Sequence, residues 1–73
     1  MRKKELDLIH RKIGAKVLYY RKLHGWTQNQ LAQISGISIS KISRVESGKY
    51  DCSIDTILIL AKTFKIDCRN LIV

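Results

Sequence analysis

Residues 27–48, TQNQLAQISGISISKISRVESG, constrain the fold more than any other part of this chain. Thr27 is a good N-cap residue, and Gln30 three positions later completes a capping box. Gly36 supplies the positive φ that lets the chain leave a helix abruptly. The segment therefore predicts two short helices, at about residues 28–35 and 39–47, joined by a tight turn.

The second of these helices has one apolar and one polar face. Ser38 can cap its amino terminus, and Ile42 and Val45 point inward at i,i+3 spacing. Hydroxyls and cations remain on the outer face, contributed by Ser40, Lys41, Ser43 and Arg44. A short helix of this kind, braced by another helix, is suited to insertion into a DNA major groove.

Helices are also predicted on both sides of this segment. A helix is predicted at about residues 6–24, where an apolar stripe is formed at spacings of three and four by Leu6, Ile9, Ile13, Val17 and Tyr20. Gly14 within it indicates close packing by another helix. After a cap at Ser53, an inward stripe is expected from Ile54, Ile57, Leu60, Ala61 and Phe64, and Asp67 can cap a last helix at 68–72. Residues 1–5, MRKKE, are expected to form a flexible basic arm.

Length and charge bound the possible functions. Seventy-three residues, 1–73, make a single domain with a small core, and the absence of proline leaves long stretches free to be helical. The formal net charge of +8 favours a polyanionic partner, either nucleic acid or an anionic membrane surface. Residues 1–24 hold eight cations against two carboxylates, which indicates either a solvated helix face or attraction to phosphates.

The cysteines, the apolar runs and the potential catalytic residues argue against several other classes of protein. Cys52 and Cys68 do not have metal-ligand spacing, and only His10 and His24 could join them, so we expect no metal and no cofactor. Two cysteines are few for a small secreted domain, which favours reduced, buried thiols in a cytoplasmic protein. No apolar run is long enough to span a membrane, and no secretory signal is expected. No nucleophile, base and orienting residue can be proposed together, so we predict that the chain is not an enzyme.

Twenty residues along the chain occur together at spacings that are more specific than a helix-turn-helix pattern alone. In chain order these residues are Arg21, Gly25, Thr27, Gln28, Leu31, Ala32, Gly36, Ile37, Ser38, Ile42, Ser43, Glu46, Gly48, Lys49, Ile54, Thr56, Ile57, Leu60, Ala61 and Phe64. With them the chain, from about residue 13 to 72, resembles the lambda-repressor-like family, the Cro and XRE type of helix-turn-helix regulators. The resemblance implies an all-α fold, a compact five-helix bundle with the helix-turn-helix as its second and third helices. It also implies a bacterial or phage-encoded protein.

The resemblance also implies roles for individual residues. Base-reading positions of the recognition helix fall on Ser38, Ile39, Ser40, Lys41 and Arg44. Contacts to the DNA backbone fall on Gln28, Ser43 and Lys49, and the polar tip of Tyr50 could also reach a phosphate. Arg21 and Glu46 match a structural ion pair of the family that ties the first helix to the end of the third.

The sequence departs from the family pattern at two positions. Ile39 stands where a polar residue is frequent, and either a contact to a thymine methyl group or a packing role would account for it. Ile59 is usually polar in the family, so an exposed apolar patch is expected there. We expect a homodimer through this patch, with Leu58, Ile59, Leu71, Ile72 and Val73 at the interface. Completion of a small core is the alternative for some of these residues.

Three functions are compatible with these features. The first is a sequence-specific regulator that binds double-stranded DNA, with a palindromic operator read by a dimer. The second is an antitoxin or similar interaction module that neutralises a partner protein and also binds its own promoter. The third, a membrane-active basic peptide, agrees less well with short helices that are capped and separated by glycines.

Overall fold

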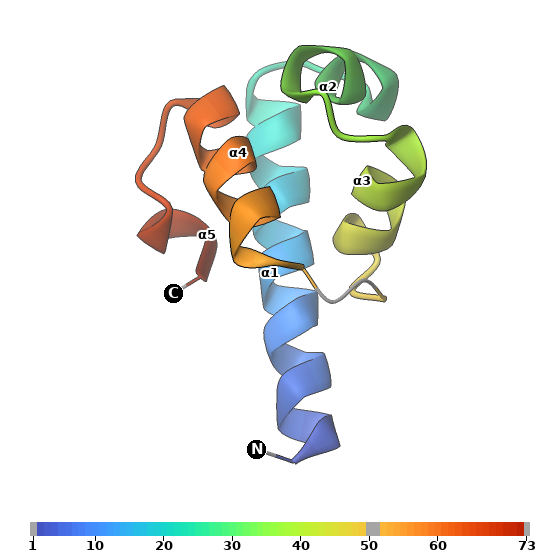
Figure 1. Cartoon of the computed structure of the whole chain (residues 1–73), viewed down its shortest axis with the longest axis vertical. Coiled ribbons are helices and arrows are strands. Elements are labelled where there is room, and N and C mark those ends of the chain that lie inside the picture. The colour runs from blue at the N-terminus through green and yellow to red at the C-terminus, as the bar shows by residue number, and fades with distance from the viewer. Residues whose placement is uncertain (1, 50–51, 73) are drawn as a thin grey trace.

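The computed structural model describes residues 2–49 and 52–72, and within them it contains five helices. These are α1 (Lys3–Leu23), α2 (Gln28–Ser35), α3 (Ile39–Glu46), α4 (Ile54–Phe64) and α5 (Arg69–Ile72). Helix α1 packs against α3, α4 and α5, and its amino-terminal end extends past the other helices (Figure 1). The predicted all-α bundle with a helix-turn-helix at its second and third helices is confirmed.

Side-chain caps begin the helices where the sequence places them. Thr27 accepts a hydrogen bond from the backbone N–H of Gln30, and the Gln30 side chain accepts one from the N–H of Thr27, which completes the capping box. The Ser38 hydroxyl accepts from the N–H of Lys41 and caps α3, and the Ser53 hydroxyl accepts from the N–H of Thr56 and caps α4. Asp67 Oδ1 accepts from the N–H of Arg69 at 2.9 Å and so caps the start of α5.

Glycines in the left-handed region end α1, α2 and α3. After α3, Gly48 has φ +76°, its N–H donates to the carbonyl of Val45, and the N–H of Lys49 donates to the carbonyl of Arg44. This pair of bonds is a Schellman motif, which satisfies carbonyls that the helix end leaves without partners. Lys65 plays the same role after α4 with φ 59°, a conformation that strains a side-chain-bearing residue.

The core lies where these helices meet. It consists of buried apolar residues from all five helices and from the turn after α2: Ile13, Val17, Leu31, Ile37, Ile42, Val45, Ile57, Leu60, Ala61, Phe64 and Leu71. Burial of these side chains provides the main stabilisation of a domain this small. The inward direction expected of Ile42 and Val45 is confirmed, since both are almost fully buried.

Gly14 is where α1 comes closest to α3. A Cβ atom built on Gly14 would collide with the backbone carbonyl oxygen of Val45 and would lie 2.9 Å from that of Glu46. Only a glycine therefore allows the two helix backbones to approach this closely. The close packing predicted for this position is confirmed.

Several sequence-based expectations are wrong in this structure. The first helix begins at Lys3 rather than at Leu6, so residues 3–5 are helical and do not form a flexible arm. Ile54, expected to face inward, is 74% exposed because it occupies the first position of α4, at the outer end of the helix. Cys52 and Cys68, expected to be buried, are half-buried.

Leu71 also differs from its expected role as an interface residue. Its side chain is fully buried and belongs to the core cluster, because α5 packs against α1 and α4 on that face. A residue without exposed surface cannot contribute to a dimer interface, so Leu71 is removed from that set. Leu58, Ile59 and Ile72 are 42–49% exposed, whereas Val73 lies outside the described residues.

Candidate nucleic-acid interface

The exposed face of α3 is polar and cationic. Ser40, Ser43 and Arg44 are exposed along it, and Lys41 is half-buried. Ser38 and Ile39 stand at its amino terminus, with Ile39 40% exposed. Because Ile42 and Val45 anchor the opposite face in the core, the bundle fixes which side chains α3 presents outward.

A hydrogen-bonded ion pair fixes the carboxyl end of α3. Arg21 of α1 donates from Nε to Glu46 Oε2 at 2.7 Å and from Nη2 to Glu46 Oε1 at 3.0 Å. The side chains of Arg21 and Glu46 are only 11% and 6% exposed. These bonds raise the pKa of the Arg21 guanidinium above its ordinary value. The geometry is the bidentate pairing in which arginine is strongest, and it joins α1 to the end of α3 as the resemblance implied.

Two further bonds connect this pair to the start of α2. Arg21 Nη1 donates to the carbonyl of Trp26 at 2.8 Å, and Gln28 Nε2 donates to Glu46 Oε1 at 3.0 Å. We call this set of Arg21, Trp26, Gln28 and Glu46 the Glu46 network. Because a carboxylate only accepts hydrogen bonds, the Gln28 nitrogen must face Glu46, and one of its two hydrogens is used there.

The start of α2 borders an open hollow next to α3. Gln28 lines this hollow together with Ile39 of α3, and its wall is completed by Arg21, Lys22, Gly25, Trp26, Thr27 and Asn29. The first N–H groups of α2 point out of this helix end, where a helix favours anions. The arrangement places a cation, Lys22, and amide donors around a space that an anionic group could enter.

Some residues of this hollow were absent from the sequence-based site. Neither Lys22 nor Asn29 was expected to belong to the site, yet both line the hollow with Gln28. The signal that could have found them is the position of Asn29 in the first turn of α2 and of Lys22 in the last turn of α1. The turn after the first helix brings these two helix ends together.

The remaining expected phosphate contacts lie at the other end of α3. Ser43 is exposed on α3, and Lys49 is exposed directly after the Schellman turn. Tyr50, the last of the expected contacts, lies outside the described residues. The described candidates therefore occur in two groups, one at the start of α2 and one at the end of α3, with the outer face of α3 between them.

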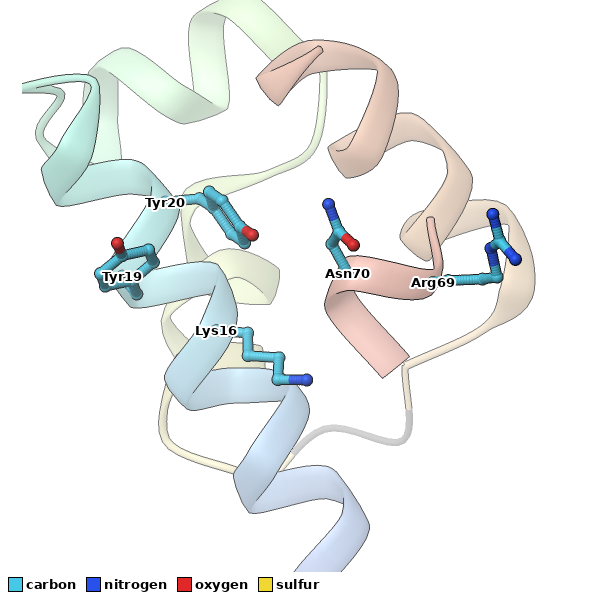
Figure 2. A pocket seen from close by; sticks show the side chains of 5 residues that line it. All are labelled: Lys16, Tyr19, Tyr20, Arg69 and Asn70. Atoms are coloured by element: carbon cyan, nitrogen blue, oxygen red, sulfur yellow. The ribbon is translucent and has the colours of Figure 1, made fainter. Parts of the chain in front are cut away.

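A second open hollow lies between α1 and α5 and is lined by none of the residues expected to contact DNA. Figure 2 shows Lys16 and Tyr20 of α1 and Asn70 of α5 around it, while Arg69 points away from α1. Arg69 is instead paired with Asp67, with Nη2 at 3.0 Å from Oδ2. No local pattern in the sequence predicts this hollow, because its residues come from two helices far apart in the chain.

Two other kinds of site are absent from the described part of the chain. Residues 2–49 and 52–72 contain no group of three or more metal-ligating His, Cys, Asp or Glu side chains. None of the helices in these ranges has the length and hydropathy needed to cross a membrane.

Curated relatives of this chain are transcriptional regulators. An uncharacterised HTH-type transcriptional regulator of Methanocaldococcus jannaschii is 38% identical over 58 residues, covering 80% of this chain and 88% of the relative. The competence pilus inhibition repressor of Acinetobacter baylyi is 46% identical over 52 residues, covering 71% of this chain. This chain spans only 47% of the length of that repressor.

Solved structures give the same result for the fold. The restriction-modification controller protein C.AhdI from Aeromonas hydrophila has a TM-score of 0.81 and 34% identity, covering 85% of this chain and 94% of its own. An HTH_3 family transcriptional regulator from Vibrio cholerae has a TM-score of 0.85 at 20% identity, covering 90% of this chain and 37% of its own, and supports the fold alone.

The family assignment follows from these comparisons and from the geometry of α2 and α3. A family model described as helix-turn-helix, HTH_3, matches residues 17–71, which include both helices and the whole Glu46 network. The lambda-repressor-like resemblance expected from the sequence is thereby confirmed. The chain belongs to the Cro/C1-type helix-turn-helix family of DNA-binding transcription regulators.

Proposed function

We propose that this protein is a sequence-specific regulator of transcription that reads double-stranded DNA with α3 in the major groove. The observation that carries the proposal is the rigid support of α3. Its inner face is anchored by buried Ile42 and Val45, and its carboxyl end by the Glu46 network. A helix held from two sides keeps its exposed side chains in a fixed orientation toward base edges.

Base contacts are assigned to the outer face of α3. In this proposal Ser38, Ser40, Lys41 and Arg44 read base edges by hydrogen bonding, since hydroxyls and cations match the donors and acceptors of the major groove. Ile39 has no hydrogen-bonding group and contributes an apolar contact to a thymine methyl group. Its 40% exposure and its place in the lining of the hollow beside Gln28 support this role over packing.

Phosphate contacts are assigned to the two ends of the helix-turn-helix. Gln28 uses the second hydrogen of its amide nitrogen, because the first is donated to Glu46. Ser43 and Lys49 contact the backbone at the other end of α3. These contacts supply affinity and orientation and carry no sequence information directly.

We also propose that two copies associate through exposed apolar residues of α4 and α5. Leu58 and Ile59 of α4 and Ile72 of α5 are each about half exposed. A two-fold dimer through this surface would place two α3 helices about 34 Å apart, the spacing of one turn of DNA, and would read a palindromic operator. The same surface suits a heterologous protein, which is the basis of the antitoxin alternative.

Selection of bound sites from random DNA tests the specific function. We expect an enriched palindrome, and Arg44→Ala should lower affinity by about 1–3 kcal/mol and relax the preference at one position of each half-site. Lys62→Ala, at an exposed position of α4, is the matched control with the same loss of charge. No enrichment at all would refute sequence-specific reading.

Two further measurements separate the finer assignments. Ile39→Gln should change the preferred base at one position, and an unchanged preference would leave Ile39 as a packing residue. Sedimentation with and without DNA tests the dimer. A monomer in both conditions that associates only with a second protein of its host would favour the antitoxin alternative.

A further inference from the structure

The amino-terminal half of α1 is bound to the turn that ends α3. A Cβ atom built on Gly48 would lie 2.8 Å from Arg11 Cγ and 3.1 Å from Arg11 Cα. The aliphatic part of Arg11 therefore packs directly on the Schellman turn, and the exposed Lys49 follows that turn. Two cations far apart in the sequence are thus held at the same end of α3.

A further cation lies next to this pair along α1. One hollow is lined by Asp7, Arg11, Gly48 and Lys49, with His10 and Ser47 completing its wall. A second, adjoining hollow is lined by Lys4, Asp7, Leu8 and Arg11. Lys4, Arg11 and Lys49 therefore form a continuous series, which we call the α1 row, and Asp7 is a single carboxylate within it.

The α1 row has the dimensions of a DNA backbone segment. Lys4 and Arg11 are two helical turns apart, a rise of about 10 Å along the axis. One DNA strand carries a phosphate for about every 3.4 Å of helix axis, so an α1 that lies parallel to the duplex axis would span about three phosphates between these two residues. Figure 1 shows that the first turns of α1 extend past the other helices, and the side chains of Lys4 and Arg11 are exposed.

We propose that the α1 row is a second phosphate-binding surface, which contacts the backbone of the duplex that flanks the bases read by α3. The inference rests on the proposed function, because Lys49 at the end of α3 is already assigned to the DNA backbone there. The row extends that contact along α1 without adding any base contact. Its effect is therefore independent of sequence and strongly dependent on salt.

The test measures binding of the full chain to one duplex of random sequence, several turns long, between about 50 and 200 mM salt. Arg11→Gln and Lys4→Gln should each weaken binding several-fold and reduce the slope of log K against log salt by about 1. Asp7→Asn should tighten binding, because it removes a negative charge that faces the phosphates. Lys12→Gln is the matched control, since Lys12 is exposed on the same helix and lines neither hollow.

Each outcome bears on the proposal. Thermal unfolding checks whether Arg11→Gln disturbs the packing on Gly48, and Lys4→Gln remains decisive in that case because Lys4 lies beyond the turn. If the slope of log K against log salt is the same for Lys4→Gln, Arg11→Gln and Lys12→Gln, the α1 row does not bind phosphates. That result would not affect the proposal that α3 reads base edges. A wild-type chain that binds no DNA at any salt would instead refute the proposed function itself.

Discussion

Replacement of Gly14 by alanine isolates the close approach of α1 and α3. Alanine is preferred over glycine in a helix interior by about 1 kcal/mol, so propensity alone predicts stabilisation. The structure predicts the opposite, because the new methyl group would lie 2.9 Å from the carbonyl oxygen of Glu46 and closer still to that of Val45. Backbone atoms cannot rotate out of the way as a flexible side chain can.

The expected magnitude follows from these opposing terms. Overpacking of a core costs about 1–3 kcal/mol, and a clash with two backbone carbonyls belongs at the upper end of that range. After subtraction of the propensity gain, Gly14→Ala should lower the free energy of unfolding by about 1–2 kcal/mol. For a domain of this size each kcal/mol lowers the Tm by about 4–8 °C.

Thermal and urea unfolding, followed by circular dichroism, measure this change. Ala15→Gly is a neighbouring control, because Ala15 is exposed and the substitution should cost only the helix propensity of about 0.5–1 kcal/mol. A Gly14→Ala protein with a higher Tm than the wild type would show that α1 and α3 separate at no cost. That result would refute the argument that this glycine sets their distance.

Three other substitutions test an ion pair, a strained backbone position and a helix cap. Arg21→Met leaves the Glu46 carboxylate buried without its cation and should lower the free energy of unfolding by urea by about 3–5 kcal/mol. The double variant Arg21→Met, Glu46→Met should recover part of that loss. If the effects of the two substitutions simply add, the two side chains are not energetically coupled. Lys65→Gly should raise the free energy of unfolding by about 0.5–1 kcal/mol, since φ 59° strains lysine, and a decrease would show that no strain exists. Hydrogen bonds from Arg69 lower the pKa of Asp67, so its stabilisation is present above the ordinary carboxyl pKa and is lost as the pH falls through the lowered value. Acid titration of stability should therefore be shallower for Asp67→Asn than for wild type, and identical curves would exclude this contribution.

Local signals explain why most of the fold could be predicted from the sequence. The capping box at Thr27, the glycine turn at Gly36 and the caps at Ser38 and Ser53 depend on residues within four positions of one another. Such interactions act before any tertiary contact forms, so pattern and propensity are sufficient to locate them. The helix bounds accordingly agree within one or two residues at most ends.

Apart from the start of the first helix, the errors occurred where tertiary packing decides burial. Leu71 belongs to a run of three apolar residues at the end of the chain, and periodicity over so short a helix cannot show which of them faces α1 and α4. Ile54 follows the helical period of its neighbours, but α4 begins there and the bundle does not extend far enough to cover it. The hollow at Lys22, Gln28 and Ile39 required three separate helices in their final positions.

In the proposed function, stability and DNA recognition depend on the same carboxylate, that of Glu46. Glu46 accepts hydrogen bonds from Arg21 and Gln28, while its own backbone carbonyl lies against Gly14. Loss of that carboxylate would release the carboxyl end of α3 and, at the same time, the Gln28 amide assigned to a phosphate. A substitution at Glu46 should therefore weaken DNA binding even under conditions in which the bundle remains folded. By contrast, a change at Arg44, whose side chain is exposed, should alter recognition while the free energy of unfolding stays close to that of the wild type.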